Sequence, residues 1–74
     1  MSRLKNLRKK KGFSQMDIQR LTGIDRSNYS KIETGKRTMT LEQCVKLALL
    51  LDTSTNYLIG LTDDPMPYHK IKKL

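Results

Sequence analysis

This sequence has very little cysteine, few aromatic residues and no long apolar run. Its one cysteine, Cys44, cannot form an internal disulfide or a metal site built from several cysteines. Tryptophan is absent and aromatics make up 5% of the chain, so the core must be mainly aliphatic. No stretch approaches the roughly 20 apolar residues of a membrane helix, and no signal-peptide pattern opens the sequence. We therefore expect a cytoplasmic protein with no membrane span.

Patterns typical of enzymes are also missing. The sequence shows no nucleophile–base pair, no cluster of metal ligands and no glycine-rich phosphate loop, and His69 is a lone histidine. A chain of 74 residues forms at most one domain, and a domain of that size buries only about 60% of its unfolded surface. Little core remains for a catalytic pocket. We expect no enzymatic activity, no catalytic residues, no cofactor and no metal.

Positive charge is abundant and unevenly placed. The chain carries 15 basic and seven acidic residues, which gives a net charge of +8. Residues 1–37 hold eleven of the basic residues and three of the acids, whereas residues 38–74 hold four of each. One basic half and one neutral half indicate a side that faces a polyanion and a side that serves packing or pairing.

Capping residues and glycines divide the chain into short helices. Ser14 and Asp17 have the spacing of a capping box, as do Thr40 and Gln43. The helices are expected over residues 3–11, 15–22, 26–33, 41–51 and 55–59. Apolar residues at helical spacing predict the inward-facing side chains. These are Leu4, Leu7, Ile18, Leu21, Ile24, Tyr29, Ile32, Leu41, Cys44, Val45, Leu47, Ala48, Leu51 and Leu58.

Only Gly23, Ile24 and Asp25 separate the second and third expected helices. Such a short link makes two helices cross steeply, and Gly23 can adopt the positive φ that the turn needs. Ile24 can fill the crossing point, and Asp25 can cap the third helix. This arrangement predicts a helix-turn-helix, in which the second helix of the pair enters the major groove of DNA.

The spacing of several motifs resembles the Xre family, the Cro and phage-repressor type of helix-turn-helix regulator. These motifs are Gly12-Phe13-Ser14-Gln15, Gly23-Ile24, Tyr29-Ser30-Lys31-Ile32-Glu33-x-Gly35-Lys36-Arg37 and Ser54 to Pro65. The match covers roughly residues 3–65. It implies an all-α, compact five-helix lambda-repressor-like domain over residues 1–65, followed by a short basic tail at 66–74. It also implies a homodimer that binds double-stranded DNA at a palindromic operator and represses transcription.

The resemblance also assigns roles to single residues. Three side chains would contact bases, namely Arg26, Ser27 and Lys31. Five would contact the DNA backbone, namely Gln15, Asn28, Ser30, Lys36 and Arg37. An edge base is a further candidate contact of Gln15, and flanking bases are alternative contacts of the other four. Arg8 and Glu33 would form an ion pair that joins the first helix to the end of the recognition helix. Two positions depart from the family pattern, because Gln19 replaces a small alanine and Asp25 replaces a serine or threonine.

Three functions stay open at this point. The first is a stand-alone regulator that binds its operator as a dimer through the surplus apolar residues Leu49, Leu50 and Ile59. The second is an antitoxin, which would use the same fold on its own promoter and also bind an unidentified protein partner. The third is an interaction module that has lost DNA binding, but the polar residues of the third helix argue against it.

Overall fold

Five helices form where the capping residues and glycines predict them. The computed structural model describes residues 2–67, and that part of the chain contains no strand. The helices are α1 (Ser2–Lys10), α2 (Gln15–Thr22), α3 (Arg26–Glu33), α4 (Leu41–Leu50) and α5 (Thr55–Leu58). The all-α prediction is confirmed, and each predicted helix boundary lies within one residue of the observed one. None of the described helices is long and apolar enough to cross a membrane. His69 and most of the predicted tail lie outside the described residues.

The predicted capping boxes are both present. Ser14 Oγ accepts a hydrogen bond from the Asp17 backbone N–H at 3.0 Å, and the Asp17 carboxylate accepts one from the Ser14 N–H at 2.8 Å. Thr40 and Gln43 exchange the same pair of bonds at 3.1 and 3.0 Å. Each box satisfies two backbone donors that the helix itself leaves unpaired. The starts of α2 and α4 are therefore fixed at these residues.

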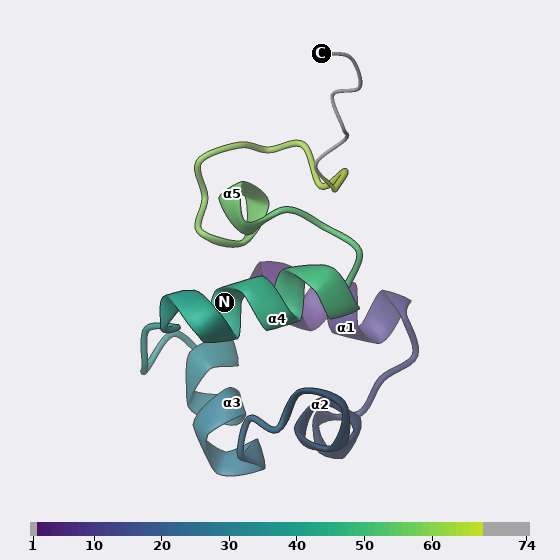
Figure 1. The fold of residues 1–74 in the computed structure, drawn as a ribbon, viewed down its shortest axis with the longest axis vertical. Coiled ribbons are helices and arrows are strands. Elements are labelled where there is room, and N and C mark those ends of the chain that lie inside the picture. Colours follow the sequence, from purple (N-terminus) through teal and green to yellow (C-terminus); the bar gives the residue numbers. More distant parts are fainter. Residues whose placement is uncertain (1, 68–74) are drawn as a thin grey trace.

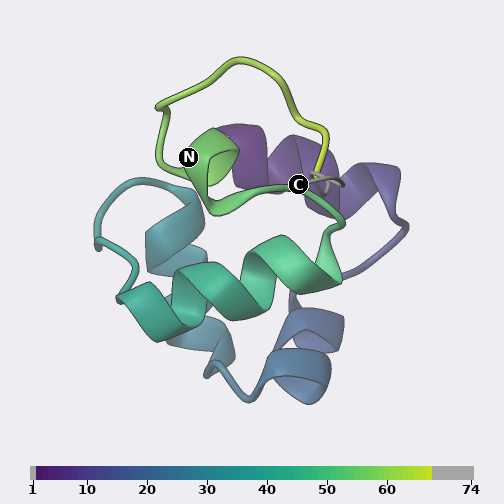
Figure 2. The same cartoon turned by 45° about the horizontal axis from the view of Figure 1, so that its top comes forward.

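The helices are arranged around α4, which crosses the centre of the molecule (Figures 1 and 2). The pair α2 and α3 lies on one side of α4, and the short α5 lies on the other. α3 also packs against α1, and α2 packs against both α3 and α4. α3 is thus held from two directions, by α1 and by α2, and keeps one face outward.

The core is aliphatic apart from one tyrosine and one cysteine. It consists of Leu4, Ile18, Ile24, Tyr29, Ile32, Cys44, Leu47, Ala48, Leu51 and Leu58. Leu7 packs against this cluster from the side, together with Phe13, Met39 and Leu50. Most of the predicted inward residues are therefore buried. Burial of apolar surface at about 25 cal/mol per Å² supplies the main stabilising contribution in so small a domain.

Three predicted core residues are exposed, so those predictions were wrong. Leu21 is 44% exposed, Leu41 79% and Val45 41%. On α2, the buried Thr22 lies about 40° to one side of Ile18, whereas Leu21 lies about 60° to the other side, away from the packed face. On α4, Val45 follows the buried Cys44 by about 100° and falls outside the buried stripe. Leu41 is in the first turn of α4, at the edge of that stripe.

The turn between α2 and α3 depends on Gly23. This residue has φ 80° and ψ 0°, in the left-handed region, and its N–H donates to Gln19 O at 2.8 Å. Ile24 is buried directly after it, and its N–H donates to Thr22 Oγ1 at 3.1 Å. The predicted positive φ and the predicted plug residue are both confirmed.

Arg3 fixes the segment after α5 onto α1. Its guanidinium donates to Tyr57 O at 2.7 Å and to Thr62 O at 2.8 Å, and it pairs with Asp63 at 2.7 Å. The same group stacks over the Tyr57 ring at 4.3 Å from the centroid. The segment beyond Gly60 contains Pro65 and Pro67, which disfavour a further helix. The contacts of Arg3 hold this segment against the rest of the domain.

The geometry of Gly23 predicts a graded loss of stability. A Cβ at this position would meet no heavy atom within 4 Å, so the cost of a side chain is conformational alone. Gly23→Ala should lower the free energy of unfolding by about 1–2 kcal/mol. Gly23→Asn should cost clearly less, because asparagine tolerates the left-handed region. Urea denaturation measures both values, and equal losses for the two variants would contradict this explanation.

Candidate nucleic-acid interface

The start of α3 is capped by two side chains that depart from the family pattern. Asp25 Oδ2 accepts from the backbone N–H groups of Ser27 and Asn28 at 3.1 and 3.3 Å. Gln19 Oε1 accepts from the Arg26 N–H at 2.7 Å, which ties α2 to the first residue of α3. The larger side chain at position 19 is therefore accommodated as a cap. All three N–H groups are therefore paired within the chain, which leaves the side chains of α3 as the groups available to a ligand.

A surface depression lies between α2 and α3, and we call it the α2–α3 depression. It is lined by Gln15, Met16, Gln19, Asp25, Arg26, Ser27, Ser30 and Lys31. The three predicted base-contacting residues are exposed there, and two of the predicted backbone-contacting residues line it as well. Five of the eight predicted DNA-contacting side chains thus share one surface, although they come from two helices.

The other three predicted DNA-contacting residues lie elsewhere. Asn28 is half-buried and lines a second depression with Thr40 and Gln43, on the side of α3 that faces α4. Its Oδ1 atom is buried and has no hydrogen-bond partner among the described residues. Lys36 and Arg37 are exposed in the turn after α3, where both of their backbone N–H groups donate to Lys31 O.

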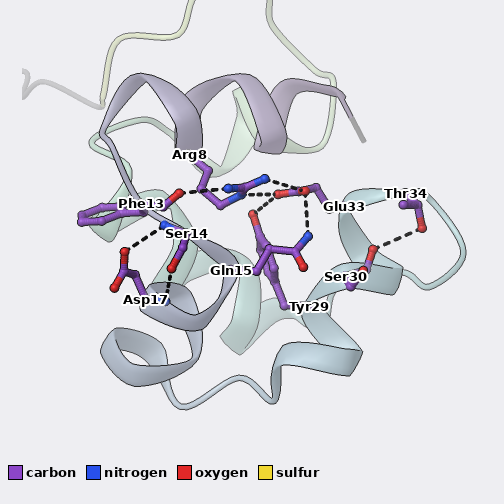
Figure 3. A network of polar contacts seen from close by, with 9 residues as sticks. All are labelled: Arg8, Phe13, Ser14, Gln15, Asp17, Tyr29, Ser30, Glu33 and Thr34. Carbon is purple, nitrogen blue, oxygen red and sulfur yellow. Dashed lines mark hydrogen bonds and ion pairs between the residues drawn. The ribbon is translucent and has the colours of Figure 1, made fainter.

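The Glu33 carboxylate, at the end of α3, joins three helices. Arg8 Nε donates to its Oε2 at 2.8 Å and Arg8 Nη2 donates to its Oε1 at 3.1 Å (Figure 3). The Tyr29 hydroxyl donates to Oε2 at 2.6 Å, and Gln15 Nε2 donates to Oε1 at 3.0 Å. A further bond from Arg8 to Phe13 O, at 2.9 Å, holds the link between α1 and α2. We call Arg8, Gln15, Tyr29 and Glu33 the Glu33 network.

Electrostatics within this network favours the ionised carboxylate. Burial alone would raise the pKa of Glu33, but the hydrogen bonds from Arg8, Tyr29 and Gln15 outweigh burial and hold the pKa below its ordinary value. The hydrogen bond to Glu33 raises the pKa of Arg8. Burial, together with the bond to Glu33, raises the pKa of Tyr29. A carboxylate accepts about four hydrogen bonds, and Glu33 receives that number.

Sequence reasoning assigned two members of this network to other roles. Tyr29 was expected in the core alone, and Gln15 was expected to contact DNA alone. Tyr29 precedes Glu33 by four residues on one helix, a spacing that places their side chains next to each other. That spacing was a usable signal for the tyrosine. The contact of Gln15 with Glu33 depends on how α2 crosses α3, which no local pattern encodes.

The predicted pairing residues do not form one patch. Leu49 is 78% exposed and lines a depression with Leu21 and the half-buried Leu50. Ile59 is exposed in a separate depression, which Arg37 also lines. Leu21 is one of the three exposed residues that sequence reasoning had placed in the core, and it extends the apolar surface around Leu49.

Comparison with known proteins identifies the family. Residues 1–63 match the family model described as "Helix-turn-helix domain". The chain belongs to this helix-turn-helix family. No solved structure matches the chain.

Three relatives from Bacillus subtilis strain 168 are similar to it. The uncharacterized HTH-type transcriptional regulator YobD is 38% identical over 97% of this chain and 64% of its own length. The SPbeta prophage-derived uncharacterized HTH-type transcriptional regulator YonR is 40% identical over 77% of this chain and 53% of its own length. The HTH-type transcriptional regulator AnsR is 42% identical over 81% of this chain and 52% of its own length. The chain therefore spans between 52% and 64% of the length of these relatives.

The Glu33 network predicts a pH-dependent contribution to stability. Because its folded-state pKa is lowered, Glu33 contributes stability that is present above its ordinary value of 4.5 and is lost as the pH falls below it. Tyr29→Phe removes one bond to the ionised carboxylate and should cost about 1.5–3 kcal/mol at pH 7. This cost should shrink as the pH falls below 4.5, and urea denaturation at a series of pH values from neutral to acidic measures it.

Tyr57→Phe is the matched control for this prediction. Tyr57 lies on α5, and its ring stacks with Arg3 outside the Glu33 network. Its substitution should produce a difference in free energy of unfolding that does not change with pH across the same range. A cost of Tyr29→Phe that is equally constant with pH would show that the hydroxyl does not support an ionised Glu33.

Proposed function

We propose that this chain is a sequence-specific, double-stranded-DNA-binding regulator of transcription of the Xre type. The observation that carries the proposal is the α2–α3 depression, where Gln15, Arg26, Ser27, Ser30 and Lys31 converge on one outward face. The whole excess of positive charge lies in the same half of the sequence. The relatives named as transcriptional regulators support DNA binding over the interaction-module alternative.

In this proposal α3 lies in the major groove. Arg26 and Lys31 are one turn and a half apart along its exposed side and present only hydrogen-bond donors, which match the O6 and N7 acceptors of guanine. Ser27, between them, is short enough to allow close approach. Lys36 and Arg37 follow the helix in an exposed turn, where their charges meet the phosphate backbone.

We further propose that the protein represses transcription as a homodimer on a palindromic operator. One recognition helix of eight residues reads few base pairs, whereas two helices about 34 Å apart read a palindrome. The exposed apolar residues Leu21 of α2 and Leu49 of α4 line one depression, which no basic side chain of α3 lines. Pairing through this surface would leave both α2–α3 depressions free for DNA.

Substitutions in the proposed interface should separate base contacts from phosphate contacts. Arg26→Ala should cost about 1–3 kcal/mol of binding free energy and relax preference at one base pair. Lys36→Ala should weaken all sequences alike and reduce the salt slope by about one unit. Selection from random DNA, followed by titration at several salt concentrations, measures both effects. An equal loss on random and selected DNA for Arg26→Ala would contradict its role in contacting bases.

Substitution on the apolar surface should separate pairing from DNA contact. Leu49→Asp should shift the protein toward monomer and weaken binding to a palindromic site about tenfold or more, because a buried leucine contributes about 1.5–3 kcal/mol. Binding to a half-site should be unchanged. Leu41→Asp is the matched control, because this exposed leucine of α4 lies outside the depression around Leu49. Sedimentation that finds a monomer both free and on operator DNA would exclude the dimer.

A further inference from the structure

The orientation of the Gln15 amide is set by the group that it faces. Gln15 Nε2 lies 3.0 Å from Glu33 Oε1. An ionised carboxylate only accepts hydrogen bonds, so the atom that faces it must be the amide nitrogen. The lowered pKa of Glu33 keeps the carboxylate ionised at neutral pH. The two ends of this amide are therefore distinguished by chemistry, and one of the two N–H groups of its nitrogen is bonded within the protein.

The amide oxygen is turned away from Glu33, as Figure 3 shows. Gln15 lines the α2–α3 depression together with Arg26 and Lys31, so an amide oxygen that does not face Glu33 offers an acceptor on a surface whose basic residues only donate. The other amide of the depression, Gln19, already accepts from the Arg26 N–H through its oxygen. Phosphate oxygens accept hydrogen bonds but donate none, so they cannot pair with the oxygen of Gln15.

We infer that Gln15 is a specificity-determining residue whose amide oxygen accepts a hydrogen bond from the exocyclic amino group of adenine or cytosine in the major groove. These two amines, N6 of adenine and N4 of cytosine, are the donors that the edges of base pairs present there. The inference rests on the proposed DNA-binding function. It revises the sequence-based expectation that Gln15 contacts the DNA backbone.

The remaining members of the Glu33 network act as positioning residues. Arg8 holds the carboxylate through two hydrogen bonds, and the buried Tyr29 hydroxyl holds it through a third. A side chain that is already held in one orientation loses less conformational freedom when it binds. Gln15 is thereby oriented before DNA arrives.

The experiment combines a protein variant with the deletion of single amines from the DNA. A site selected by the unmodified protein is rebuilt as a series of DNA duplexes. Each duplex has purine in place of one adenine, or 2-pyrimidinone in place of one cytosine, at the equivalent position of both half-sites. At one base pair of each half-site, loss of the amine should weaken binding of the unmodified protein about three- to tenfold, the size of one hydrogen bond. The same deletion should change binding of Gln15→Met less than twofold.

Ser30→Ala is the matched control, because Ser30 lines the same depression but lies outside the Glu33 network. Whatever this variant does to overall affinity, it should retain the same fold loss of binding when the amine that Gln15 contacts is deleted. Melting curves establish that each variant is folded. The scan of amines with the unmodified protein needs no variant, and a site without any amine-sensitive base pair would overturn the inference.

Two failures are distinguishable in this design. Selective binding by the unmodified protein, combined with an equal loss for Gln15→Met on every sequence, would overturn the inference and leave the proposed function intact. Sensitivity of the unmodified protein, but not of Gln15→Met, to a methylphosphonate in place of one phosphate would then identify a backbone contact through the remaining N–H of Gln15. Absence of any sequence preference in the unmodified protein would overturn the proposed function, and the inference with it.

Discussion

The structure depends on one buried negative charge. Glu33 is 6% exposed, and its carboxylate receives four hydrogen bonds from side chains of three helices. Removing such a charge from water is costly, and only complete pairing offsets the cost. Arg8 of α1, Gln15 of α2 and Tyr29 of α3 must therefore all be in place together. In so small a domain, this requirement fixes how the three helices cross more narrowly than aliphatic packing alone could.

The two acidic residues near the proposed DNA surface, Glu33 and Asp25, are compensated in different ways. Glu33 is neutralised by Arg8 inside the molecule, so its repulsion of a phosphate backbone is largely cancelled. Asp25 is exposed but caps α3 through two backbone N–H groups. Together with Gln19, it occupies the donors at the start of α3, where many helices bind anions. In the proposed function, recognition by α3 would then come from its side chains, and the identity of those side chains would determine which sequence is bound.

Local features of the sequence predicted the helices well. Capping boxes, an aspartate cap and Gly23 act within a few residues, so they can be recognised without knowledge of the fold. The direction of the buried face on each helix was harder to predict, because it depends on where neighbouring helices lie. Leu21 and Val45 satisfied the apolar pattern, yet each lies beyond the stripe that its neighbours cover. The bond between Gln15 and Glu33 joins residues 18 positions apart, and it arises only from the crossing of α2 and α3.

Gln15 belongs both to the Glu33 network and to the proposed DNA surface. Arg26 and Lys31 are exposed and contact nothing in the network, so their effect on DNA binding is separable from folding. Gln15 has its nitrogen in the network and its oxygen on the proposed DNA surface, so any change that loosens Glu33 also loosens an acceptor in that surface. Under the proposed function, stability and sequence preference are therefore coupled at this residue. A core residue such as Tyr29, which is fully buried, would then influence which bases are preferred without approaching the DNA.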